Sequence, residues 1–293
     1  MSTHGAHTRS SLSGWGSGLV GVLIFSGSLP ATRVAVADFP PVFLTCARAV
    51  IAGMLAALLL AALRAPRPVR TDLAPLAVVA LGVVVGFPLL TAFALTDVSA
   101  AHAIVFVGLL PLATACFGVL RGGERPRRPF WIFSGLGSAT VGAFALGHDS
   151  RASLAGDLLM VAAIVACGLG YAEGARLSRR LGGWQVISWA LVLALPFMAA
   201  FGLAATPPVW RDVGTAAWLG LAYVSVFSML VGFVFWYHGL ARGGIASVGQ
   251  LQLLQPFFGL ALASVFLGEP IAWTMVAATG LVVVWVALAR RFA

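Results

Sequence analysis

Stretches of apolar residues, each long enough to cross a lipid bilayer, recur ten times along this chain of 293 residues. A membrane-spanning helix needs about 20 mostly apolar residues. The stretches cover residues 15–31, 39–63, 73–95, 100–120, 130–147, 155–175, 184–203, 213–236, 245–267 and 271–289. Only 9% of the residues are charged, against about 25% in an average soluble domain. The sequence therefore predicts an all-α membrane protein of ten transmembrane helices joined by short loops, with no domain outside the bilayer.

The first stretch has a second interpretation. Arg9, the apolar run after it and Ala35-Val36-Ala37 are together also typical of a secretory signal peptide and its cleavage site. We favour a transmembrane helix, because the internal repeat described below needs this stretch as the partner of the sixth. Residues 1–14 then form a short tail before it.

The distribution of arginine predicts how the helices are oriented. The chain has no Lys, and its 18 basic residues are all Arg. Fourteen lie in the N-terminal tail, the even-numbered loops and the C-terminal tail, three lie in the opposite loops, and Arg48 lies within the second stretch. Loops rich in Lys and Arg stay on the cytoplasmic side of a membrane. Both termini, including the tail of residues 1–14, are therefore predicted to be cytoplasmic in a multi-pass protein of the bacterial inner membrane.

Several chemistries are excluded by residues that the chain lacks. A P-loop needs a Lys on the nucleotide phosphates, so ATP hydrolysis of that kind is excluded, and we expect no ATPase subunit to be required. Cys46, Cys116 and Cys167 lie within apolar stretches without metal-ligand spacing, so no metal and no cofactor are expected. No cluster of His, Asp or Cys suggests an intramembrane enzyme. The net charge of +9 indicates asymmetric loops rather than binding to nucleic acid.

An internal repeat relates the two halves of the chain. With an offset of 145 residues, Pro111 aligns with Pro256, and Gly123-Glu124 aligns with Gly268-Glu269. Pro and Glu are rare in transmembrane helices, so this shared spacing is more specific than the Leu and Ala matches around it. Each half contains five helices, and because five is odd the second half enters the membrane from the opposite side. The pattern predicts two inverted repeats, residues 15–150 and 151–293, with a substrate site near the midplane where they meet.

These motifs carry a resemblance to a known family. Residues 99–124, with Leu-Pro at 110–111, and residues 244–269, with Gln-Pro at 255–256, both resemble the end of an EamA repeat. The whole chain resembles the ten-helix carriers of the drug/metabolite transporter superfamily. The resemblance implies a basket around a central cavity built mainly from helices 1, 3, 4, 6, 8 and 9, with helices 5 and 10 outside. It also implies export of small organic molecules, for which amino-acid exporters, including those for aromatic amino acids, are a prominent precedent.

Prolines in the middle of apolar stretches are candidates for kinks and gating. Pro111 and Pro256 lie about halfway along helices 4 and 9, where each is expected to free the carbonyl four residues earlier, at Val107 and Gln252. Pro88 in helix 3 is a similar candidate. Such a kink either serves packing alone, or shapes the substrate site and lets a half-helix move.

Polar, ionisable and aromatic side chains within the helices are candidates for substrate binding. Amide groups do not belong against lipid, so the side chains of Gln252 and Gln255 either join helices together or bind the substrate. The other candidates can line the cavity, exchange protons with it, or serve packing and interfacial solvation instead. They are Trp189, Phe87, Tyr237, His238 and Glu173.

Other notable residues are interpreted as structural. Arg48 is expected to form an ion pair or to extend towards the lipid headgroups. Asp97 and Asp157 are expected to be solvated, and Trp236 is assigned to an interfacial aromatic belt. Glu124 and Glu269 each precede another helix, whose N-terminus they are expected to cap.

Elimination suggests the substrate class. The six cavity helices hold no basic residue at mid-depth, which disfavours nucleotides and phosphates, and few acids, which disfavours a pump for cationic drugs. The sequence therefore predicts a secondary transporter that exports small metabolites, foremost neutral or aromatic amino acids, by alternating access. Its predicted partners are the small-molecule substrate and the bilayer. A multidrug or other metabolite exporter, a channel and an intramembrane enzyme are the alternatives.

Overall fold

A computed structural model describes residues 3–292 apart from residues 123–126, 148–152, 207 and 244–247. The described regular structure is entirely helical, with no strand in these ranges. Three elements, labelled η, depart from α-helical hydrogen bonding. In chain order the elements are α1 (Thr3–Ser26), α2 (Ser28–Ala35), α3 (Pro41–Ala62), α4 (Arg70–Val79), η1 (Ala80–Gly86), α5 (Phe87–Asp97), α6 (Ala100–Val107), α7 (Leu110–Gly122), α8 (Arg128–Gly147), α9 (Leu154–Leu181), α10 (Gly183–Ala204), α11 (Thr215–Ala222), η2 (Tyr223–Val231), α12 (Gly232–Gly243), η3 (Gly249–Leu254), α14 (Gln255–Leu267) and α15 (Trp273–Arg290).

Seven helical segments in the described ranges are long and apolar enough to cross a membrane. They are Gly14–Ala35, Pro41–Ala62, Arg70–Asp97, Ala100–Arg121, Leu154–Leu181, Gly183–Ala204 and Thr215–Arg242. Two shorter apolar helices follow at Leu251–Leu267 and Trp273–Ala289. The all-α membrane fold expected from the sequence is thus confirmed, while the count of ten transmembrane helices stays a prediction.

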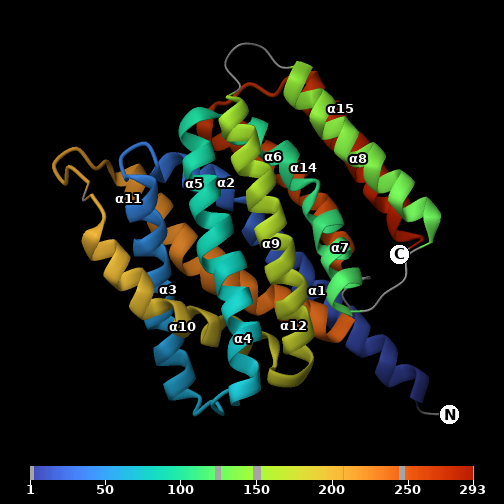
Figure 1. The fold of residues 1–293 in the computed structure, drawn as a ribbon, viewed down its shortest axis with the longest axis horizontal. Coiled ribbons are helices and arrows are strands. Elements are labelled where there is room, and N and C mark those ends of the chain that lie inside the picture. Colours follow the sequence, from blue (N-terminus) through green and yellow to red (C-terminus); the bar gives the residue numbers. More distant parts are fainter. Residues whose placement is uncertain (1–2, 123–126, 148–152, 207, 244–247, 293) are drawn as a thin grey trace.

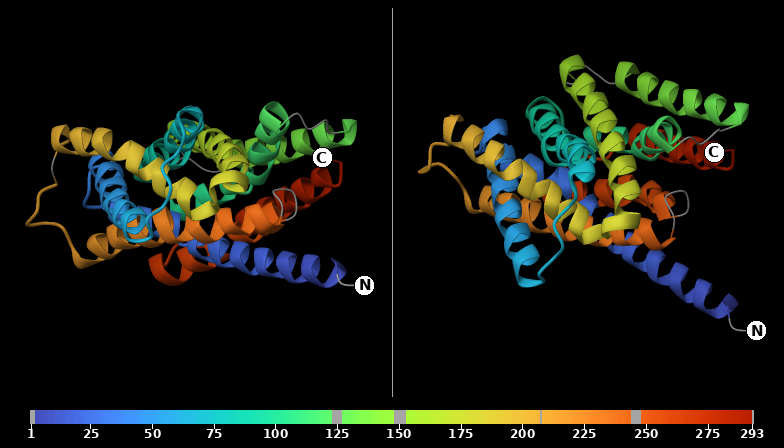
Figure 2. Two further views of the ribbon diagram at one scale, coloured as in Figure 1. Left: turned by 90° about the horizontal axis from the view of Figure 1, so that it is seen from below. Right: turned by 60° about the horizontal axis from the view of Figure 1, so that its bottom comes forward.

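Helices that are far apart in the sequence lie side by side. α3 packs along α10 at one side of the molecule, and α8 packs along α15 at the other (Figure 1). Between these pairs, α1 packs along α12, and α9 packs against α5 and α7. Two further views show α8 and α15 together at the edge of the bundle (Figure 2). The core that can hold a site is therefore formed by the helices between the two outer pairs.

Small residues let these central helices approach closely. A side chain at Gly239 of α12 would begin only 2.8 Å from the backbone nitrogen of Gly18 on α1. A side chain at Gly82 of η1 would begin 2.6 Å from the carbonyl oxygen of Ala166 on α9. Helices in lipid associate through such close backbone packing, because lipid offers no hydrophobic driving force between them. The first helical segment is accordingly an integral part of the bundle.

Two of the long segments contain a π-helical turn in the middle. The Phe87 N–H donates to the Gly82 carbonyl at the end of η1, and the Gly232 N–H donates to the Phe227 carbonyl at the end of η2. Both bonds span five residues, as in a π-helix. Pro88 is the second residue of α5, directly after the first of these turns, where its missing N–H needs no helical partner. A proline at this position therefore accounts for the interruption predicted in helix 3.

The two symmetric prolines also mark interruptions, in a different way from that expected. Pro111 and Pro256 are the second residues of α7 and α14, so each begins a new helix rather than bending a continuous one. The carbonyl of Gln252 is not freed, as the sequence suggested, because the Gln255 N–H donates to it in the 3₁₀ segment η3. A tighter turn before the proline has replaced the lost α-helical bond.

Candidate functional site

A small cavity of about 20 Å³ lies where the interrupted helices meet. That volume holds about one water molecule. We call it the central cavity. Its polar lining consists of Ser28, Arg48, Tyr171, Ser228 and Gln255. Its other walls include Phe25, Phe87, Pro88, Leu110 and Phe233.

The polar groups of the central cavity are linked by few hydrogen bonds. The Oγ atoms of Ser28 and Ser228 lie 2.7 Å apart. Arg48 Nη2 donates to the Val224 carbonyl over 3.3 Å and to Ser228 Oγ over 3.4 Å. Gln255 Nε2 donates to the Phe25 carbonyl over 3.5 Å. In the described part of the chain, Arg48 Nε and Gln255 Oε1 have no hydrogen-bond partner.

Aromatic rings from the lining of the central cavity pack together. Phe25 and Phe233 have ring centroids 4.9 Å apart, and Tyr171 and Phe233 have centroids 5.8 Å apart. Trp236 joins the cluster through contacts with Phe25 and Tyr171. It is buried in the bundle, so its assignment to an interfacial belt is wrong. On a helix that packs closely against α1, it turns inwards to the core instead of outwards to the headgroups.

Buried acidic side chains form ion pairs at the two ends of the bundle. The end with Arg64, Arg67, Arg70, Arg179 and Arg180, where α3 and α9 finish, is called the Arg-rich end. Here Glu173 of α9, which is 0% exposed, is paired with Arg121 of α7 over 3.3 Å and with Arg176. Asp72 of α4 is paired with Arg180. α9 is therefore fastened to its neighbours at this end.

At the opposite end, His102 of α6 and Asp157 of α9 form a buried contact of 2.7 Å between Nε2 and Oδ1. Asp157 is thus not solvated as expected, because the start of α9 packs beside the start of α6. Asp97 is exposed, in agreement with the sequence. This contact brings the ends of two helices together across the bundle.

Glu269 caps a helix, but not the next one in the chain. Its two carboxylate oxygens accept hydrogen bonds from the backbone N–H groups of Ala100 and Ala101, over 3.0 and 2.7 Å. A carboxylate at a helix N-terminus satisfies free N–H groups and is stabilised by the helix dipole. The capped helix is α6 rather than α15, because the loop after α14 passes the N-terminus of α6. Glu124 lies outside the described residues.

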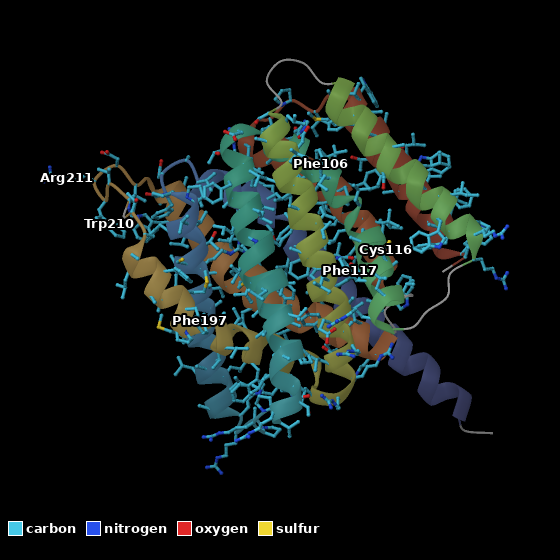
Figure 3. The ribbon with its side chains drawn as sticks, viewed as in Figure 1. Phe106, Cys116, Phe117, Phe197, Trp210 and Arg211 are labelled. Carbon is cyan, nitrogen blue, oxygen red and sulfur yellow. The ribbon has the colours of Figure 1, made fainter. Side chains whose placement is uncertain are left out.

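A larger groove of about 640 Å³ lies on the side of the bundle. It runs between α3, α10 and the α4–α5 segment, and its lining is almost wholly apolar. Phe197, one of its residues, projects from α10 on the side of the molecule away from α8 and α15 (Figure 3). Such a surface suits lipid chains and has no charged group to orient a polar solute. The smaller central cavity is the better candidate for a substrate site.

Comparison with known families decides what kind of protein this is. Residues 12–146 and again residues 154–291 match the EamA-like transporter family. The chain belongs to this family. It is therefore a multi-pass membrane transporter of small molecules rather than an enzyme.

Relatives of this EamA-like transporter agree with that assignment. The chain is 65% identical over 280 residues to the uncharacterized transporter YdeK of Bacillus subtilis (strain 168), covering 96% of this chain and 98% of the relative. It is 26% identical over 256 residues to a probable terminal-alkyne amino-acid exporter of Streptantibioticus cattleyicolor, covering 85% and 83%. A solved crystal structure matches 96% of the chain, and the same share of its own, with a TM-score of 0.66 at 23% identity. That structure supports the fold.

The candidates chosen from the sequence fall into two groups in this transporter. Gln255, Phe87 and Pro88 line the central cavity, and Tyr237 lies one layer behind, with its ring against Phe233 and its hydroxyl donating to the Gly170 carbonyl over 3.3 Å. The others are not part of the lining. They are Gln252, Trp189, His238, Glu173, Pro111 and Pro256. The functional roles of both groups stay predictions.

Arg48 is the main cavity residue that sequence reasoning placed elsewhere. Only 4% of it is exposed, so it does not extend towards headgroups, and no described acidic residue forms an ion pair with it. The prediction that the six cavity helices hold no basic residue at mid-depth does not cover Arg48, which lines the central cavity from another helix. The second predicted helix, which corresponds to α3, was not among the predicted cavity helices. The Arg48 side chain of α3 nevertheless reaches the lining of the central cavity. One signal in the sequence was available. No acidic residue lies three or four positions from Arg48, so its own helix offers no ion-pair partner.

We expect Glu173→Gln to lower stability without changing substrate affinity. The substitution removes the carboxylate that pairs with Arg121 and Arg176, and we expect a loss of about 1–3 kcal/mol, less than for a fully buried pair because both arginines are about half exposed. Thermal unfolding in detergent, with and without substrate, measures both effects. Arg179→Gln, an exposed change on the same helix, is the control. A weaker substrate affinity at unchanged stability would assign Glu173 to the site instead.

Proposed function

We propose that this EamA-like transporter is a secondary carrier that exports small metabolites, foremost neutral or aromatic amino acids, by alternating access. The observation that supports this most directly is the central cavity. It combines charged, amide and hydroxyl groups with aromatic walls at the point where interrupted helices meet. Binding sites for small polar solutes have this composition, and broken helices at mid-membrane are typical of secondary transporters.

Two inverted five-helix repeats account for the positions of the interruptions. Moving η1 by 145 residues gives residues 225–231, which fall within η2. The same offset moves the start of α7 at Leu110 onto the start of α14 at Gln255. The family match also occurs twice, over 12–146 and 154–291. These agreements support repeats over residues 15–150 and 151–293, each with five membrane-spanning helices.

Helix packing fits the same symmetry. Exchange of the two halves turns the contact between α1 and α12 into the contact of α9 with the α4–α5 segment, and both are present. The pairs α3 with α10 and α8 with α15 each exchange onto themselves, and the contact of α6 with α14 exchanges onto that of η3 with α7, which is also present. Such an arrangement lets one half rock against the other around a site on the symmetry axis.

The substrate class rests on the lining of the cavity and on one relative. Cationic drugs would need an acidic partner, and no described acidic residue lines the central cavity. The relative named as a probable terminal-alkyne amino-acid exporter supports amino acids as the proposed substrate class. Aromatic walls from Phe25, Phe87 and Phe233 suit an apolar or aromatic side chain. A multidrug exporter is therefore the weaker alternative.

Both termini are proposed to be cytoplasmic, which places the Arg-rich end in the cytoplasm. A reporter enzyme that is active only outside the cytoplasm should give background activity when fused after Ala293. The same reporter inserted in the loop between α10 and α11, which carries Trp210 and Arg211 at one edge of the molecule (Figure 3), should be active. The reverse result would invert the proposed orientation.

Purified protein in liposomes should exchange phenylalanine without ATP. We expect uptake of labelled phenylalanine to saturate and to be accelerated by unlabelled phenylalanine trapped inside, because a carrier returns faster when loaded. Liposomes without protein provide the control. Uptake that rises linearly with concentration and is not accelerated by trapped substrate would indicate a channel, and a strict requirement for ATP would contradict a secondary carrier.

Pro256→Ala should reduce transport more than it reduces the amount of folded protein. The substitution supplies an N–H that can donate to the Gln252 carbonyl, which favours a continuous helix over the break between η3 and α14. We expect the maximal flux to fall at least about tenfold, since the break is the proposed hinge. Pro196→Ala, on a helix outside the cavity, is the control. In contrast, Gln255→Leu should weaken affinity while the protein still inserts. Normal flux in both variants would place the moving part elsewhere.

A further inference from the structure

We propose that Arg48 binds the carboxylate group of the substrate, so that this transporter is selective for small organic monocarboxylates. The inference rests on the proposed function and makes its site specific. It assigns a direct role in binding to a residue of α3, which packs mainly along the outer helix α10.

The charge balance around Arg48 is the first observation. Each described acidic residue is either exposed or engaged by another group. Asp72 pairs with Arg180, Asp157 with His102, and Glu173 with Arg121 and Arg176. Asp38 accepts from the backbone of Gly214, Glu269 caps α6, and Asp97 and Asp212 are exposed. Within the described ranges, each buried acid thus has a basic partner of its own, and none is paired with Arg48.

The hydrogen bonds of Arg48 are the second observation. A guanidinium has five N–H donors, yet towards the described residues only Nη2 donates, to a carbonyl and a hydroxyl at 3.3 and 3.4 Å. Those lengths exceed the usual range of 2.7–3.2 Å for strong N–H to oxygen bonds. Nε is buried without a partner among the described residues. An arginine with a purely structural role normally donates to several close acceptors. Arg48 instead keeps unused N–H donors and a positive charge that no described carboxylate balances.

The surroundings of Arg48 define what kind of anion fits. The lining offers one cation, so a singly charged carboxylate is matched better than a doubly charged phosphate. Gln255 Oε1 lies in the same cavity, has no partner among the residues that the structure describes, and can accept a hydrogen bond from a substrate amino group. The rings of Phe25, Phe87 and Phe233 provide a place for an apolar side chain. In this closed form the cavity holds about one water, so the substrate enters when the interrupted helices separate.

Binding of chemical analogues to wild type and to Arg48→Gln tests the assignment. Four probes differ in one group each: phenylalanine, 3-phenylpropionate without the amine, phenylalanine amide without the charged carboxylate, and phenethylamine without any carboxyl group. We expect the two carboxylates to raise the unfolding temperature of the wild type and to compete for phenylalanine flux. In Arg48→Gln, their affinity should fall about 10- to 100-fold, as for loss of a charge-assisted hydrogen-bonded pair. The amide and the amine should bind weakly and equally to both proteins.

Two further variants separate binding from a structural role. Arg48→Met removes a buried charge without leaving a carboxylate unpaired, so the unfolding temperature without ligand should stay the same or rise. Arg33→Gln is the control, because Arg33 also donates to a backbone carbonyl, that of Leu95, but lies outside the cavity. It should keep the affinity for carboxylates within about twofold.

The outcomes distinguish this inference from the proposed function. If wild type moves or binds the amide and the amine as well as the carboxylates, the carboxylate assignment is wrong while the carrier function stands. A lower unfolding temperature in Arg48→Met, with unchanged carboxylate affinity in Arg48→Gln, would make Arg48 structural. If carboxylates bind in an Arg48-dependent manner but no solute is moved, the binding site stands and the carrier function fails. If no carboxylate binds the wild type, the inference is overturned.

Discussion

Backbone hydrogen bonding is the constraint on which this structure depends. In hydrocarbon, every N–H and carbonyl group must find a partner within the protein, so regular helices are the default. This chain departs from regular helices at η1, at η2, between α6 and α7, and between η3 and α14. Residues adjoining each of these interruptions line the central cavity. The cost of broken helices is therefore concentrated at the proposed site, where π-helical and 3₁₀ bonds or side chains satisfy most of the backbone.

The charged side chains follow a similar division. At the Arg-rich end, Glu173 and Asp72 each form an ion pair with an arginine. At the opposite end, Asp157 contacts His102. All three contacts involve α9, which also lines the central cavity through Cys167 and Tyr171. In the proposed cycle, opening towards one side requires the contacts at that end to separate while those at the other end hold. α9 therefore lines the central cavity and also takes part in the ionic contacts at both ends of the bundle.

Local patterns in the sequence were enough for seven apolar spans and for the interruptions at Pro88, Pro111 and Pro256, because span length and the missing proline N–H act on a single helix. They also found Gln255 and Phe87. Arg48, Trp236 and Glu269 were misplaced because their roles depend on partners in distant parts of the chain: Val224 for Arg48, Phe25 and Tyr171 for Trp236, and the start of α6 for Glu269. Such partners are set by helix pairing, which periodicity and composition do not encode.

The magnitudes explain how an unpaired arginine can serve a carrier. An Arg at the centre of a membrane helix costs about 2.5–3.5 kcal/mol on insertion scales. The two hydrogen bonds of Arg48 are longer than the usual range and go to neutral acceptors, so they offset only part of that cost in the empty form. A bound carboxylate contributes about 1.5–3 kcal/mol through charge-assisted hydrogen bonds, in the same range as the deficit. Because a ligand shifts a conformational equilibrium only by its differential affinity, a substrate whose carboxylate binds Arg48 stabilises the form in which the interrupted helices have separated to admit it.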